Sequence, residues 1–319
     1  MGLELVLLIL CIGIVGWIGF SVLTLDNSNQ EPTDISAWIE QSLVMFLAGF
    51  GLCSIFLFLL AILGEFTRSA ILAVFSILVV SYLLLPHAKK SKTIFLKFTR
   101  YLVFCLSLAF LVSGLGKLSK PYEAIIGRDD ASVYVGTAFQ LMKSGALSYT
   151  DPLALSMTTA ERQAFFRGPE GSYVRFPGGV YFANLSKGLV AFDRFHLFPT
   201  WLALGIDFMG INRFLYLLTL FSTLSLICLY FIGSKLGGPL LGISVPSVLF
   251  VFYPQFYYSH LPMSELLAQT LFLGGLLTFV SGLMNASILS AGQQRLSGNE
   301  RHAIADTGDR SGMVGGPHL

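Results

Sequence analysis

The fold of this chain is decided by an apolar run at residues Leu43–Leu63, LVMFLAGFGLCSIFLFLLAIL. The run contains no charged side chain, and its length fits the roughly 20 residues that a helix needs to cross the hydrocarbon core of a bilayer. The whole sequence has the same character, since 54% of its 319 residues are hydrophobic and 12% are charged. Soluble domains carry about 25% charged residues. The composition therefore predicts an integral membrane protein.

Further apolar runs accompany this one along the chain. The predicted spans are Leu3–Leu25, Leu43–Leu63, Ala70–Pro86, Tyr101–Gly116, Phe214–Gly233, Gly237–Tyr257 and Leu266–Met284. The first run lacks the basic start and the small-residue cleavage site of a signal peptide, so we expect a retained span there. The sequence thus predicts an all-α polytopic membrane protein with about seven transmembrane helices.

The orientation follows from the connection between the third and fourth spans. Five basic residues crowd it: Lys89, Lys90, Lys92, Lys97 and Arg100. Short basic loops stay in the cytoplasm, so the fourth span runs outward. The stretch from about 117 to 212 then becomes a large extracytoplasmic loop. Its own basic residues do not oppose this placement, because loops longer than about 60 residues are translocated regardless of charge.

Two adjacent carboxylates, Asp129 and Asp130, open this loop directly after Arg128. One of them would cap a helix that is predicted to run to about Ser144 and to end at Gly145. The alternative is that the acids only cap the helix and favour its dipole, and this alternative stays open. A second acid, however, adds like-charge repulsion and little capping. Ionisable residues near a bilayer mark functional sites, and we expect the pair to be one.

The rest of the loop contains one more helix signal. Thr158 and Glu161 have the spacing of a capping box, which predicts a second short helix with an apolar face for the bilayer surface. The segments that follow are aromatic and are predicted to be irregular. The net charge of +2 is too slight to indicate nucleic acid as a partner, and none is expected. The four cysteines lie in apolar runs without metal-site spacing and are predicted to be buried.

The order of these residues resembles that of the GT-C superfamily of membrane glycosyltransferases. The likeness is to the bacterial members grouped with protein mannosyltransferases and aminoarabinose transferases (family 39), and it covers about residues 100–284. An outward span and an acidic pair are followed by a shared pattern, here Tyr134, Ala138, Leu141, Gly145 and Asp151-Pro152. Downstream stand a His-Pro aromatic segment, an Arg that opens the next span and a Ser-Glu pair that opens a later one, here His196, Pro199, Trp201, Arg213 and Ser264-Glu265.

The resemblance implies that a sugar is transferred with inversion from a polyprenyl-phosphate donor to a lipid, glycan or protein acceptor of the cell envelope. The active face would be the extracytoplasmic side of the plasma (inner) membrane. Asp129 or Asp130 would be the base, and Arg213 or Arg128 would contact the leaving phosphate. The other substrate-binding candidates are Tyr134, His196, His260 and Glu265. A divalent cation, Mg or Mn, is an option, since some relatives pair such acids with an ion.

The resemblance also divides the chain. Residues 1–100 hold the first three spans and the basic loop, residues 101–284 the partial GT-C-like core, and residues 285–319 a polar tail that is predicted to be disordered. Family members usually continue with more spans, so we expect a C-terminally short member. The alternatives are a lipid-linked-sugar transporter or flippase and an inactive truncated membrane scaffold. Transporters place ionisable residues in mid-membrane, and the predicted spans contain almost none, which favours the enzyme.

Overall fold

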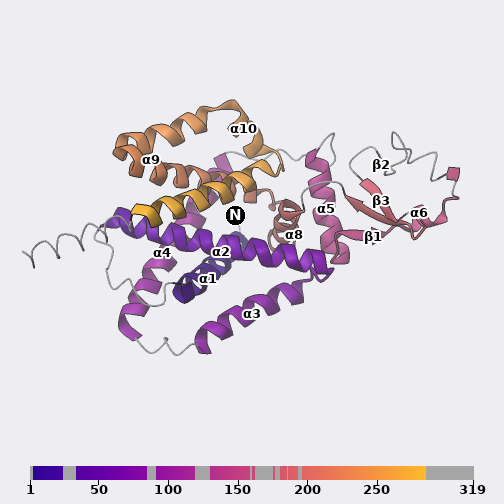
Figure 1. Cartoon of the computed structure of the whole chain (residues 1–319), viewed down its shortest axis with the longest axis horizontal. Coiled ribbons are helices and arrows are strands. Elements are labelled where there is room, and N and C mark those ends of the chain that lie inside the picture. The colour runs from indigo at the N-terminus through magenta and orange to yellow at the C-terminus, as the bar shows by residue number, and fades with distance from the viewer. Residues whose placement is uncertain are drawn as a thin grey trace, which may run out of the picture. The chain divides into compact units, whose positions relative to one another are not determined.

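A computed structural model of the chain describes residues 3–23, 34–84, 91–118, 130–158, 160–161, 175–176, 180–184, 186–192 and 196–284 (Figure 1). The chain divides into two units, Met1–Gly274 and Gly275–Leu319. The second unit is described through residue 284, where it continues a helix. The predicted tail, 285–319, lies outside the described residues.

The described part of the chain is mostly helical. Its helices are α1 (Leu3–Leu23), α2 (Ile35–Leu63), α3 (Arg68–Leu84), α4 (Ser91–Leu118), α5 (Asp130–Ser144), α6 (Pro152–Ser156), α8 (Leu197–Met209), α9 (Tyr216–Val251) and α10 (Tyr253–His260), followed by the helix Glu265–Met284. Four stretches are long and apolar enough to cross a membrane: Ile35–Leu63, Lys97–Gly116, Tyr216–Val251 and Glu265–Met284. A mostly helical chain with four helices that could span a membrane is thus confirmed, whereas the number of seven spans stays a prediction.

Helix α9 consists of two arms that meet at a sharp turn (Figure 1). Gly237 and Gly238 have non-helical backbone angles, and Gly238 has φ +77°, a conformation that side chains with a Cβ rarely adopt. Pro239 then opens the second arm. The sequence predicted two spans that meet here. The second arm ends at Val251, because the ring of Pro254 removes a helical hydrogen bond and clashes with the preceding turn.

Helix α4 begins earlier than predicted. It starts at Ser91 rather than at Tyr101, so Lys97 and Arg100 lie in the helix and not in a loop. Lys and Arg are good helix formers, and their charge does not prevent the helix from continuing beyond the apolar part. The basic residues still precede the apolar half of α4, as the orientation argument requires.

Helices α1 and α2 pack with their backbones in close contact. The cause is a pair of glycines, because a methyl group added at Gly49 would overlap the backbone of Gly16. Small residues at such crossings allow the close approach that stabilises helix pairs in membranes. The buried faces that flank the crossing are apolar, with Ile12 on α1 and Phe46 on α2 fully buried.

Helix α8 was not predicted, because the sequence around His196 and Trp201 was interpreted as an irregular aromatic segment. The structure instead has a helix in which Trp201 is fully buried. Its ring stacks on Phe50 of α2 with 4.5 Å between centroids. Its indole N–H donates a hydrogen bond to the Ser54 hydroxyl at 3.0 Å. A buried indole needs such a partner, and Ser54 therefore fixes α8 against α2.

The large loop also contains a small β-sheet where irregular structure was predicted. Its order is β1-β4-β3-β2, all pairs are antiparallel, and the strands are β1 (Ser148–Thr150), β2 (Arg175–Phe176), β3 (Val180–Asn184) and β4 (Leu189–Phe192). Asn184 stabilises the β3–β4 turn, since its side-chain oxygen accepts hydrogen bonds from Ser186 and from the Lys187 backbone. Strands this short give a weak periodic signal, which is why the sequence did not reveal them.

Contacts between helix ends show which ends lie on the same side of the helices as the large loop. Arg213, just before α9, pairs with Glu4 of α1 at 3.3 Å. Arg68 of α3 pairs with Asp207 of α8 at 3.5 Å. These ends adjoin the large loop, because the Phe66 N–H, between α2 and α3, donates to the Gly145 carbonyl at the end of α5.

The opposite ends of two helices meet in the same way. Lys235, at the end of the first arm of α9, forms an ion pair of 2.9 Å with Glu40 near the start of α2. The other end of α2 connects through Gly64 to the side of the large loop. The helices therefore alternate in direction, as antiparallel spans must.

Candidate functional site

The structure describes one of the two acidic residues at the start of α5. Asp130 is the first residue of α5 and is partly exposed, as a residue in the first turn of a surface helix should be. Asp129 and Arg128 lie outside the described residues. Tyr134 follows Asp130 by one helical turn, so the two residues share one face of α5.

Tyr134 joins three elements. Its side chain is 3% exposed, and its hydroxyl lies 2.9 Å from the Ser264 hydroxyl just before the helix Glu265–Met284. Its ring meets the edge of Phe198 of α8, with 5.3 Å between centroids and planes at 88°. The acidic end of α5 and the Ser264-Glu265 pair therefore belong to one region. Glu265 itself is exposed in the first turn of its helix.

His260 ends α10, four residues before Ser264, and is 5% exposed. Its Nδ1 lies 2.7 Å from the Phe256 carbonyl and 3.0 Å from the Ser259 hydroxyl. A carbonyl oxygen can only accept, so Nδ1 carries the hydrogen and Nε2 is the acceptor in the neutral ring. The ring packs on Phe256 at 4.3 Å between centroids. His260 is therefore a fixed imidazole rather than a mobile, hydrated one.

His196 stands at the start of α8, two residues before Phe198. It occupies the N-cap position without a side-chain cap hydrogen bond. Its Nδ1 is buried and has no hydrogen-bond partner among the described residues. Burial lowers the pKa of the imidazole from its usual value. His196 is therefore a neutral, partly buried ring whose Nδ1 is available to a ligand that reaches it.

Arg213 has an acidic partner in the folded chain. Its guanidinium pairs with Glu4 at 3.3 Å, and both side chains are about half exposed, at 46% and 44%. No local pattern predicts this acidic partner, which is more than 200 residues away in the chain. A phosphate would have to share the guanidinium with this carboxylate. The five N–H donors of arginine allow such sharing.

Some residues of the motifs shared with GT-C enzymes stabilise the fold. Asp151 caps α6, since its Oδ1 accepts from the backbone N–H groups of Leu153 at 2.8 Å and Ala154 at 3.0 Å. Gly145 has φ +73° and ends α5. Trp201 is also structural, because its ring is fully buried against Phe50.

The capping box of the second predicted helix is present. The Thr158 backbone N–H and hydroxyl both donate to the Glu161 carboxylate, at 2.7 and 2.8 Å, and the Glu161 N–H donates to the Thr158 hydroxyl at 3.3 Å. These bonds lower the pKa of Glu161 from its usual value. Residues 160–161 are helical, and the rest of the predicted helix lies outside the described residues.

A metal site is not shown. Within the ranges that the structure describes, no group of three or more His, Cys, Asp or Glu side chains is arranged to hold a metal ion. Asp129 is not among those residues. The divalent cation therefore stays a prediction.

Comparison with known proteins adds no relative: no family model, no curated protein and no solved structure matches this chain.

Proposed function

We propose that this chain is a membrane glycosyltransferase that moves a sugar from a polyprenyl-phosphate donor to a cell-envelope acceptor on the extracytoplasmic face. The observation that carries the proposal is the hydrogen bond between Tyr134 and Ser264. It joins the acidic start of α5 to the Ser264-Glu265 pair, two sequence motifs that are 130 residues apart. Both motifs belong to the pattern that the GT-C enzymes share.

The reaction needs a base on the acceptor side. Asp130 or Asp129 takes the proton of the acceptor hydroxyl while that oxygen attacks the anomeric carbon. The bond between the anomeric carbon and the phosphate oxygen breaks at the same time, so the configuration inverts. Asp130 is suited to this role because it is partly exposed and lies at a helix start, where its carboxylate is favoured.

The leaving polyprenyl phosphate needs positive charge. Arg213 or Arg128 provides it, and Arg213 is half exposed beside Glu4. Glu265 is exposed next to Ser264 and accepts hydrogen bonds from sugar hydroxyls. The ring nitrogens of His196 and His260 donate or accept hydrogen bonds for the same purpose, whereas Tyr134 is a positioning residue, because its hydroxyl is already bonded to Ser264.

Seven spans are part of this proposal. Counting each arm of α9 separately, the helices α1, α2, α3, α4, α9 and Glu265–Met284 provide them. The ion pairs at the helix ends support the alternation that this arrangement needs. The polyprenyl chain of the donor would remain in the bilayer while its sugar reaches the ends of the helices.

Substitution of the acids tests the proposal. Asp129→Asn and Asp130→Asn, singly and together, would be reconstituted in proteoliposomes with a radiolabelled polyprenyl-phosphate hexose or pentose and an envelope-lipid extract. We expect the loss of the base to reduce transfer by roughly 10²- to 10⁴-fold. Glu161→Gln is the matched control, since it also converts an exposed acid to its amide but keeps a residue that suits a capping box.

The outcomes separate the three classes of protein. A transferase loses labelled product in the Asp variants while the protein stays folded in the membrane. A transporter changes the flux of labelled lipid across the bilayer without any change in product. Unchanged transfer by the double variant, or no transfer by the parent chain with any of these donors, would contradict the assignment.

A further inference from the structure

Helix α10 lies in a stretch of sequence without formal charge. From Leu236 to Ser264 there is no Asp, Glu, Lys or Arg. The stretch comprises α10 and the second arm of α9, which is part of a helix long and apolar enough to cross a membrane. At Phe252 the backbone is extended, with φ −72° and ψ 118°, and the chain turns there from the second arm into α10 (Figure 1).

The exposed face of α10 is aromatic, and its opposite face is polar. Tyr253, Phe256 and Tyr257 are 72%, 51% and 42% exposed, and their spacing of three and four residues places them on one face. Gln255 is only 6% exposed, and its Nε2 donates to the hydroxyl of Ser222 in the first arm of α9 at 3.3 Å. This is the reverse of a helix on a water-facing surface, which turns its polar side outward.

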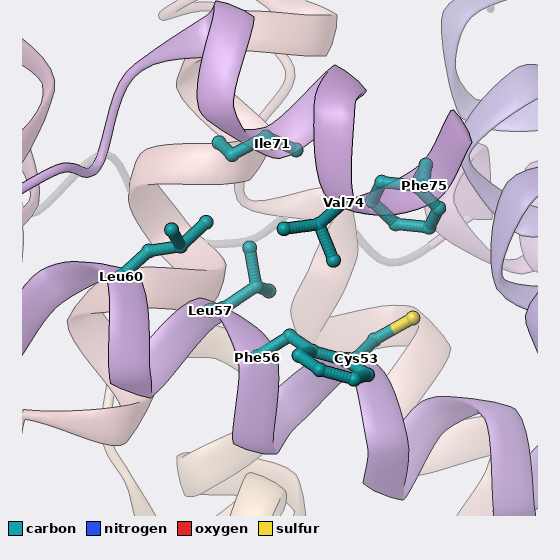
Figure 2. A pocket seen from close by; sticks show the side chains of 7 residues that line it. All are labelled: Cys53, Phe56, Leu57, Leu60, Ile71, Val74 and Phe75. Atoms are coloured by element: carbon teal, nitrogen blue, oxygen red, sulfur yellow. The ribbon is translucent and has the colours of Figure 1, made fainter. Parts of the chain in front are cut away.

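Apolar faces of other helices in this chain cover one another. Between α2 and α3, the side chains of Leu57 and Val74 point toward each other across a narrow apolar cleft (Figure 2). Within the described part of the chain, nothing covers the exposed rings of α10 to this extent. They therefore face the surroundings of the protein.

The exposed side chains change in kind along this stretch. In the second arm of α9 they are aliphatic, with Ile243 60% and Val248 67% exposed, as suits a surface in contact with lipid chains. In α10 they are largely tyrosines, and the Tyr257 ring lies 6.3 Å from that of Tyr253 and 5.5 Å from that of Tyr258, centre to centre. Tyrosine has an apolar ring and a polar hydroxyl, and it is enriched where hydrocarbon meets the lipid headgroups.

The position of α10 at one end of the helices agrees with this change. Lys235, before the second arm, pairs with Glu40 at the ends away from the large loop. The second arm runs back from there, and Ser264, four residues after α10, is bonded to Tyr134 of α5. Helix α10 therefore lies at the end of the helices beside the large loop.

We propose that α10 lies flat in the boundary between headgroups and hydrocarbon, in the leaflet on the side of the large loop, with its aromatic face against phospholipid. The occupant is lipid rather than a second copy of the chain, because this face continues the exposed aliphatic surface of a possible span and changes from aliphatic to tyrosine where that span ends. The inference does not depend on sugar transfer. Its consequence for the site is that His260, at the end of α10, is held near the level of the lipid phosphates.

The depth of spin labels in phosphatidylcholine proteoliposomes tests this placement. Tyr253→Cys and Tyr257→Cys, each in the full chain without the native cysteines, would carry a nitroxide whose relaxation by oxygen and by a water-soluble nickel chelate is compared. Ile243→Cys in the second arm is the matched lipid control, and Lys187→Cys in the β3–β4 turn is the water control; all four side chains are exposed. We expect the ratio of oxygen to nickel relaxation to be highest at 243, lowest at 187, and intermediate at 253 and 257.

The two α10 labels should also lie at equal depth. A helix perpendicular to the bilayer would separate them by about 6 Å, because four residues rise that far. Such a difference, or a ratio at both positions equal to that of either control, would overturn the placement. Shielding from both relaxing agents, together with broadening from a label on a second copy, would show that protein covers the face instead. If one of the α10 variants does not fold, the other still decides between lipid, water and protein.

Discussion

At the scale of single residues, His196 combines partial burial with an Nδ1 that has no partner among the described residues. Burial lowers its pKa below its usual range, so the ring resists protonation in the folded protein. The unfolded chain takes up a proton near pH 6.5, as free histidine does. Below that pH the unfolded state binds more protons than the folded state, and the contribution of His196 to stability falls as the solution becomes more acidic.

His196→Gln should therefore change the pH dependence of stability. We expect the melting temperature of the variant, relative to that of the parent chain, to be higher at pH 5 than at pH 7.5. Thermal unfolding in detergent across this pH range measures the difference. A difference that stays constant with pH would show that the imidazole is protonated equally easily in the folded and unfolded chains.

At the scale of helices, the crossing of α1 and α2 depends on the absence of a side chain at Gly49. Gly49→Ala should lower the melting temperature strongly, because the new methyl group overlaps the backbone of Gly16 and the two helices must separate. Gly51→Ala on the same helix is the matched control, since a Cβ there has no neighbour within 4 Å. That variant should be neutral or more stable by up to about 1 kcal/mol, because alanine favours the helix.

Unfolding in a denaturing detergent, monitored by circular dichroism, distinguishes the two glycine variants. Equal effects would mean that α1 and α2 are not in close contact at this crossing.

The elements also show what the sequence reveals. Long apolar runs predicted the helices that contain them, and Gly145 and the Thr158–Glu161 box were recognised from local chemistry. Helix α8 was missed because its burial comes from distant partners, Phe50 and Ser54, which no local pattern reports.

In the candidate site, too, local features were predicted from the sequence and long-range contacts were not. Asp130 at a helix start follows from the local sequence, and the structure agrees. The bond between Tyr134 and Ser264 and the pair between Arg213 and Glu4 join segments far apart in the chain, and only the folded structure shows them.

At the scale of the whole molecule, the alternation of the helices predicts which residues are exposed on each side of a membrane. In a background without the native cysteines, Lys187→Cys in the β3–β4 turn should react with a membrane-impermeant maleimide in intact cells. Leu236→Cys, at the turn between the arms of α9, should react only after the cells are opened, because it adjoins the opposite ends of the helices. Both side chains are exposed, so burial does not explain a difference. If Leu236→Cys reacted in intact cells and Lys187→Cys reacted only in opened cells, the predicted orientation would be wrong.

The glycine turn within α9 has a consequence for the way this chain enters a bilayer during synthesis. The second arm, residues 239–251, rises about 20 Å, which is less than the roughly 30 Å of hydrocarbon that a lone span must cover. Gly233 and Gly242 let the two arms touch backbone to backbone just beside the turn. We therefore expect the short arm to insert together with its longer neighbour as a helical hairpin. Both arms must then leave the ribosome before either one reaches its final position in the bilayer.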